Sequence, residues 1–301
     1  SVEKILLNLM NRIEIPEAGI AVNIPSSYAE MTRPQLFHVM RQFHALQCGR
    51  ISLTEFRIRV LYKLAGIKRT VRSIVWERLH PAAAHRRAEK VVLLAEELLG
   101  FLFSTNNDEL LPAFDCLENH LPTLRIGWRR LVGPADALMD ISFEELIAAD
   151  AELTLYTATK DSRHIDNLLA TLYRRPGPQQ PAGRRVEPLD IDRTERTARI
   201  FRFVPSWKKH LFLLWYAACV DNLQRGTFTI NGREVSFAPL FNDNEPPGKS
   251  LGWLGTLFNM AERRTFGDMK ETSATNIIDV LLLLLNDKYN ADNARKNHKT
   301  D

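Results

Sequence analysis

Apolar side chains recur at helical spacing along most of the chain. In the stretch 32–47 they return every three or four positions, and Pro34 sits in the first turn, where its missing N–H costs nothing. Similar patterns, most of them bounded by Ser, Thr, Gly or Pro, occur at 52–66, 71–79, 81–103, 142–173, 191–225, 251–267 and 275–289. The sequence therefore predicts a mainly α-helical fold of one or more multi-helix domains.

Two stretches interrupt this helical pattern with β signals. Residues 13–25 read as two short strands around a Pro/Gly turn. Residues 227–237, TFTINGREVSF, alternate apolar and polar positions around Asn231-Gly232, a dipeptide that suits a type I′ hairpin turn. We expect a small antiparallel β accessory made of these elements.

The clearest break in the pattern is RRPGPQQPAGRRVEP at 174–188, which is rich in Pro, Gly, Gln and Arg and poor in apolar residues. Such composition predicts an exposed, flexible loop or linker over 176–190. It would separate a helical N-terminal region, 1–175, from a helical C-terminal region, 191–301, that carries the hairpin. The alternative is that this segment becomes ordered on a partner.

The N-terminal region contains a weak internal similarity. RVLYKLAG ends one helical pattern and LLATLYRRPG ends another, with Tyr173 following Tyr62 by 111 positions. Ser142, the expected cap of the later helix, follows Thr32 by 110 positions. One interpretation is a degenerate duplication of a two-helix unit. The other is that two amphipathic helices share a composition.

The most apolar stretches predict the core. We expect buried side chains at Leu211, Leu214, Trp215, Leu282 and Leu285. The apolar run around 277–285 is too short to span a bilayer and contains an aspartate, so a core helix is the expected structure. We therefore expect no membrane segment. The first residues, SVEKILLNLM, lack the basic start and small-residue cleavage site of a signal peptide, but the sequence begins without Met, which leaves open that residues upstream were removed.

Charge is distributed unevenly, although the net charge is only +4. Residues 33–90 contain 13 Lys and Arg against 3 Asp and Glu, a net charge of +10, whereas residues 91–175 contain 7 against 14, a net charge of −7. Such polarity predicts either nucleic-acid binding or the docking of copies and partners through complementary charge. Among the basic residues, the candidates for partner binding are Lys68, Arg69, Arg72, Arg174, Arg175, Arg184 and Arg185.

Residues that carry catalysis or metal binding do not form a known motif. The sequence contains no P-loop, GxGxxG or GxSxG pattern. His44 and Cys48 share one helix face, but a second pair of metal ligands is not evident. The three cysteines are widely spaced and odd in number, which favours a reducing compartment over a disulfide scaffold. We therefore expect no catalytic residue, metal or cofactor.

Three blocks of the sequence form a recurrent pattern. They are IPSSYAEMTRPQLFHVMRQFHAL with ISLTEFRIRVLYKLAGI, then ISFEELIAADAEL with LLATLYRRPG, and finally SLGWLGTLFNMAERRTFGDMKETSATNIIDVLLLLL. Together these blocks resemble a family of uncharacterised tail-morphogenesis proteins from Bacteroidetes prophages and tailed phages. The resemblance implies a tail assembly chaperone-like or minor tail protein. It implies no catalytic residues, and the strongly basic segment 33–90 departs from a plain chaperone.

The leading hypothesis is therefore a phage-derived assembly or structural protein that binds other tail or structural proteins, or copies of itself. It would act in the bacterial host cytoplasm during assembly, with the virion as a further location. A nucleic-acid-associated protein using segment 33–90 is the alternative, and an unrecognised enzyme is the third hypothesis.

Overall fold

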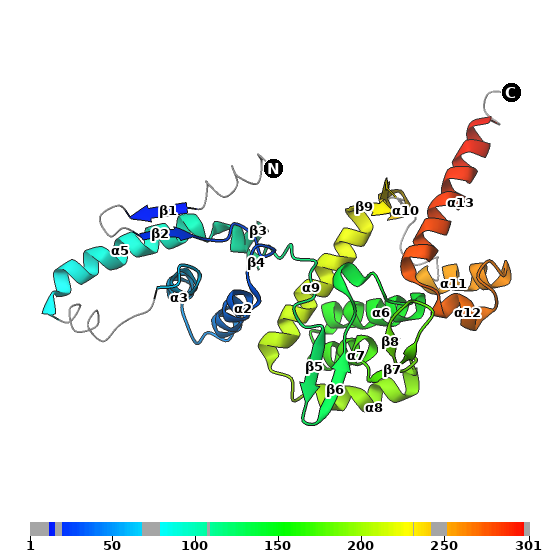
Figure 1. The fold of residues 1–301 in the computed structure, drawn as a ribbon, viewed down its shortest axis with the longest axis horizontal. Helices are drawn as coiled ribbons and strands as arrows, with labels where there is room; N and C mark the ends of the chain where they lie inside the picture. Colours follow the sequence, from blue (N-terminus) through cyan, green and yellow to red (C-terminus); the bar gives the residue numbers. More distant parts are fainter. Residues whose placement is uncertain are drawn as a thin grey trace. The chain divides into compact units, whose positions relative to one another are not determined.

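A computed structural model of the protein describes residues 12–15, 20–67, 79–106, 109–230, 232–241 and 252–297. Across these ranges the chain is mainly α-helical and has five two-stranded antiparallel sheets, which confirms the predicted fold class (Figure 1). The chain divides into two compact units. Unit 1 comprises Ser1–Cys116 with Ser206–Leu211, and unit 2 comprises Leu117–Pro205 with Phe212–Asp301.

This division does not follow the predicted boundaries at 175 and 191. The segment 176–190 is a hairpin within unit 2, where β7 (Pro176–Gln179) pairs with β8 (Arg185–Val186). Ala182 and Val186 are buried in it. Two small apolar side chains are enough to dock a hairpin this short, but they are too few to stand out in a composition rich in Pro, Gly and Arg.

Unit 1 contains two hairpins and a group of helices. Its described elements are β1 (Arg12–Ile15), β2 (Ile20–Asn23), α2 (Arg33–Gln47), α3 (Leu53–Leu64), α5 (Pro81–Leu98), the 3-10 turn η2 (Gly100–Leu102), β3 (Phe103–Asn106) and β4 (Glu109–Pro112). The predicted N-terminal strands are confirmed, with Ile13 opposite Val22. The helix expected at 71–79 falls on residues that lie almost entirely outside the described ranges.

Helices α2 and α3 pack against each other through their apolar faces. At the start of α2, the Thr32 N–H donates a hydrogen bond to the Gln35 side chain at 2.9 Å. The Phe43 and Phe56 rings meet edge to face, with centroids 6.5 Å apart. Met40 is 1% exposed between them and the rest of the core. This pair of helices therefore has an ordinary apolar interface with a polar cap at the surface.

Unit 2 holds most of the remaining elements. They are β5 (Thr123–Ile126), β6 (Arg129–Val132), the 3-10 turn η3 (Asp136–Leu138), α6 (Phe143–Thr159), α7 (Ser162–Leu172), β7, β8, α8 (Ile191–Phe201), α9 (Ser206–Arg225, from Phe212 onward), β9 (Thr227–Ile230), β10 (Arg233–Ser236), α10 (Ala238–Phe241), α11 (Gly252–Glu262), α12 (Met269–Ala274) and α13 (Ile277–Asn297). Helix α7 packs against both α6 and α8. The predicted hairpin is confirmed as β9 and β10, and Gly232 in its turn has a φ of +76°.

The predicted core residues are only partly correct. Leu211, Trp215 and Leu285 are buried, whereas Leu214 and Leu282 are half-exposed. On α13 Leu281, which is 1% exposed, is buried in place of its neighbour Leu282. The run of five leucines shows no periodicity, so the sequence could not indicate which of them faces inward. None of the helices within the described ranges is long and apolar enough to cross a membrane.

Candidate partner-binding site

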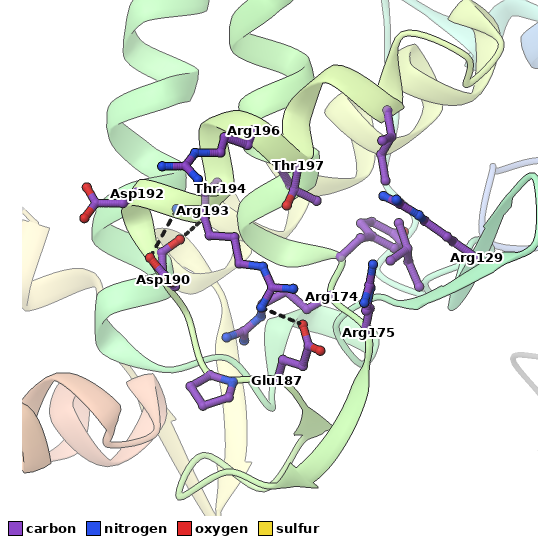
Figure 2. Close-up of a pocket in the computed structure, with 15 residues that line it drawn as sticks. Arg129, Arg174, Arg175, Glu187, Asp190, Asp192, Arg193, Thr194, Arg196 and Thr197 are labelled. Atoms are coloured by element: carbon purple, nitrogen blue, oxygen red, sulfur yellow. Dashed lines mark hydrogen bonds and ion pairs between the residues drawn. The ribbon is translucent and has the colours of Figure 1, made fainter.

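A pocket of about 430 Å³ lies in unit 2, between strand β6, the end of α7 and the first turns of α8 (Figure 2). Arginines dominate its charged lining, with five of them against three carboxylates. The charged lining residues are Arg129, Arg174, Arg175, Arg193, Arg196, Glu187, Asp190 and Asp192. A concave site with a surplus of guanidinium groups can bind anions through paired N–H donors.

The chain turns sharply where α7 ends, and this turn brings two of the arginines to the pocket. Arg175 precedes Pro176, and a residue before proline is disfavoured in the helical conformation. The chain therefore becomes extended, and Arg174 exchanges backbone hydrogen bonds with Val132 of β6 at 2.8 and 3.1 Å. Tyr173 anchors the turn, because its buried hydroxyl donates to the Leu121 carbonyl at 2.7 Å.

Helix α8 forms the other wall. Asp190 caps this helix, and its carboxylate accepts a hydrogen bond from the Arg193 N–H at 3.1 Å. The Arg193 guanidinium lies 3.8 Å from the Glu187 carboxylate, a loose and exposed ion pair. Arg196 lies one turn further along α8 and has no ion pair within the described part of the chain.

A buried carboxylate lies behind the pocket. Glu145 in α6 is 1% exposed and forms ion pairs with both Arg174 and Arg184. It also completes the capping box of α6, because its other oxygen accepts the Ser142 N–H at 2.7 Å. Burial, and then the neighbouring Arg184 guanidinium, lower the pKa of Arg174 to about 9. The two arginines still remain charged at neutral pH, so the cluster carries a net positive charge.

This arrangement corrects the role predicted for Arg184. Its side chain is only 3% exposed, and its guanidinium neutralises Glu145 instead of facing a partner. Arg174 also contacts Glu145, but it lines the pocket as well. Arg175 lines the pocket as an exposed residue, whereas Arg185 is exposed on β8 outside it. The other candidates, Lys68, Arg69 and Arg72, lie outside the described residues.

The hairpin of β5 and β6 adds a feature that was not predicted from the sequence. Its two-residue turn is Gly127-Trp128, and Gly127 has a φ of +59°, as the first position of a type II′ turn requires. The Trp128 residue is 93% exposed. Leu124 and Leu131 form a cross-strand pair on the buried face, and this short alternation around a glycine is the signal from which the hairpin was predictable.

Within the described ranges, His, Cys, Asp and Glu side chains form no group of three able to hold a metal ion. The Cys48 Sγ lies 3.8 Å from Nε2 of His44, which places the two residues on one face as their spacing indicates.

Comparisons with known proteins return no match to a family model, a curated protein or a solved structure. The arginine pocket and the neighbouring hairpin therefore carry the functional argument.

Proposed function

We propose that this chain is an assembly or structural protein of a tailed phage or prophage, and that it acts by binding a protein partner during tail or virion morphogenesis. The observation that carries the binding role is the arginine pocket with an exposed tryptophan beside it. Arginine and tryptophan are the residue types most enriched among the energetically dominant positions of protein interfaces. The phage context rests on the three sequence blocks that resemble the tail-morphogenesis family.

The partners proposed are other tail or structural proteins, with a second copy of this chain as a further candidate. Binding would take place in the bacterial host cytoplasm while particles assemble. No cofactor is part of this proposal, and neither is a catalytic step.

Gene deletion in the phage or prophage that carries this chain tests the proposed function. We expect particles that lack normal tails in electron micrographs, and recovery of tailed particles when the gene is supplied from a plasmid. Normal tailed particles from the deletion strain would overturn the proposal.

Measuring the affinity of the purified protein for duplex DNA at increasing salt concentration distinguishes a nucleic-acid role from this function. Phosphate contacts give a steep fall of affinity with salt, with a log–log slope of about 0.9 per contact. We expect negligible DNA binding at physiological salt. The triple variant Lys68→Glu, Arg69→Glu and Arg72→Glu should leave that result unchanged, whereas tight binding that this variant abolishes would favour the nucleic-acid alternative.

A further inference from the structure

Three arginines of the pocket, Arg129, Arg175 and Arg196, are without a carboxylate partner among the described residues, and the first two lie close together. Arg129 comes from β6 and Arg175 from the turn after α7. Figure 2 shows both side chains on the same side of the pocket, away from Asp190 and Asp192. One side of the pocket therefore has two guanidinium groups that are unpaired within the described part of the chain, with Glu187 as the neighbouring carboxylate, and the other side has Asp190 and Asp192.

The hairpin next to this side of the pocket has features that do not stabilise the fold. Arg125 and Arg130 are direct cross-strand neighbours, and like charges in that arrangement are destabilising. Trp128 leaves its large apolar surface in water. Arg129 belongs both to the hairpin and to the pocket lining, so the hairpin tip adjoins the pocket.

We infer that the pocket and the adjoining hairpin tip bind an acidic segment of the protein partner. Carboxylates of the segment pair with Arg129 and Arg175, and an apolar side chain beside them packs on the Trp128 ring. This inference rests on the proposed function, because it names the chemistry of the partner segment for the same site. Charge complementarity of this kind aligns a partner and speeds encounter, while the aromatic contact excludes water from the ion pairs.

The carboxylates in the lining favour a peptide over a nucleic acid. A nucleic-acid strand has a phosphate at every nucleotide, so a strand lying across the pocket would bring charge close to Glu187, Asp190 and Asp192. In a peptide, by contrast, carboxylates occur only where the sequence has Asp or Glu. It can present backbone N–H groups or basic side chains to the acidic side of the pocket.

The test uses the full-length protein and fluorescence anisotropy with three labelled probes. The first is a short peptide that alternates Asp or Glu with Gly and contains one Phe. The second is the same peptide with each acid replaced by its amide, and the third is an oligothymidine of similar length. We expect the acidic peptide to bind, and the amide peptide to bind at least about tenfold more weakly.

Variants then locate the binding. Arg129→Ala with Arg175→Ala should weaken the acidic peptide about tenfold or more. The control, Arg199→Ala with Arg233→Ala, removes the same charge from exposed positions of unit 2 outside the pocket and should have little effect. Trp128→Ala should also weaken binding, and because the residue is 93% exposed the variant should fold normally.

Three results would overturn the inference. They are failure of the acidic peptide to bind or equal binding of the amide peptide, equal loss in the control and pocket variants, and tighter binding of the oligothymidine through Arg129 and Arg175. Failure here can be told apart from failure of the proposed function. If deletion of the gene removes tails but the acidic peptide does not bind, only the inference is wrong. If the peptide binds but deletion leaves tails intact, the proposed function is wrong.

Discussion

The helix pairs α2–α3 in unit 1 and α6–α7 in unit 2 are built on the same local pattern but serve different purposes. Each begins with a hydroxyl residue whose N–H is bound by the side chain three positions later. In the first pair that side chain is Gln35, which is neutral and half-buried. In the second it is Glu145, which is buried and ion-paired with Arg174 and Arg184.

This single difference determines which elements pack beside the start of each pair. A neutral, half-buried amide requires no counter-charge, so the first pair ends at its apolar interface. A buried carboxylate must be neutralised, because an unpaired charge in the interior is strongly destabilising. Glu145 thereby holds the end of α7 and the β7–β8 hairpin against α6. One local motif can thus be a simple cap in one place and the anchor of a site in another.

The largest expected effect comes from removing this anchor. Glu145→Ala removes the carboxylate that forms ion pairs with both Arg174 and Arg184 and should lower the free energy of unfolding by about 3–5 kcal/mol. Gln35→Ala, the matching position of the first pair, loses only a cap and should cost about 1 kcal/mol. Urea denaturation measures both.

Glu145→Gln serves as a second variant, since it keeps a hydrogen-bond acceptor for the cap but removes the charge. Equal losses for Gln35→Ala and Glu145→Ala would contradict the difference between the two pairs.

Limited trypsin digestion tests whether the β7–β8 hairpin is docked in the folded protein through the ion pair of Arg184 with Glu145. Arg184 is buried, so the bond after it should resist cleavage in the native protein. If Glu145→Gln lowers the free energy of opening by about 3 kcal/mol, cleavage should become about a hundredfold faster. Mass spectrometry of the first fragments identifies the site. Early cleavage after Arg184 in the unmodified protein would instead support the flexible linker that the sequence predicts.

Tyr173 at the end of α7 and Tyr62 in the last turn of α3 offer a smaller contrast. Tyr173→Phe removes a buried hydrogen bond to the Leu121 carbonyl and leaves that carbonyl unsatisfied, which should cost about 1–3 kcal/mol. Tyr62 is half-exposed and makes no hydrogen bond through its hydroxyl within the described part of the chain. Tyr62→Phe should therefore leave the thermal midpoint nearly unchanged, and a similar fall in both variants would argue against an anchoring role for Tyr173.

The smallest expected effect concerns Asp150. This residue follows the cap of α6, Ser142, at the same spacing at which the buried Met40 follows the cap of α2, Thr32. Burial raises the pKa of Asp150, so its charged form is less favourable in the folded chain than in the unfolded chain. Stability from this group is present at acid pH and lost as the pH rises through the folded pKa.

Asp150→Asn should therefore raise the melting temperature slightly at neutral pH. The difference from the unmodified protein should vanish as the pH falls through the aspartate range. A destabilised variant at neutral pH would show that the carboxylate is a favourable partner in the fold.

Local signals in the sequence predicted much of the fold. Thr32, Ser142 and the Asn231-Gly232 turn all act on residues within a few positions of themselves, so their effects were readable without the tertiary structure. The same reasoning missed the hairpin around Trp128, although the alternation of Leu124, Leu131 and a central glycine was present. Of the candidate site residues, Arg174 and Arg175 line one pocket. The residues of β6 and α8 that line the same pocket could not be predicted from the sequence.

The sequence by itself determined the helical pattern, the caps, the β9–β10 turn and the surplus of arginine near the end of α7, because each depends on nearest neighbours along the chain. Only the tertiary structure decided that Arg184 is an interior counter-ion and that Arg129, Arg175 and Arg196 surround one pocket. Glu145 and Arg184 are 39 positions apart, and the charge of one has no effect on the other until the fold brings them into contact. Burial then makes that contact obligatory, because a carboxylate removed from water must find its charge partner within the protein.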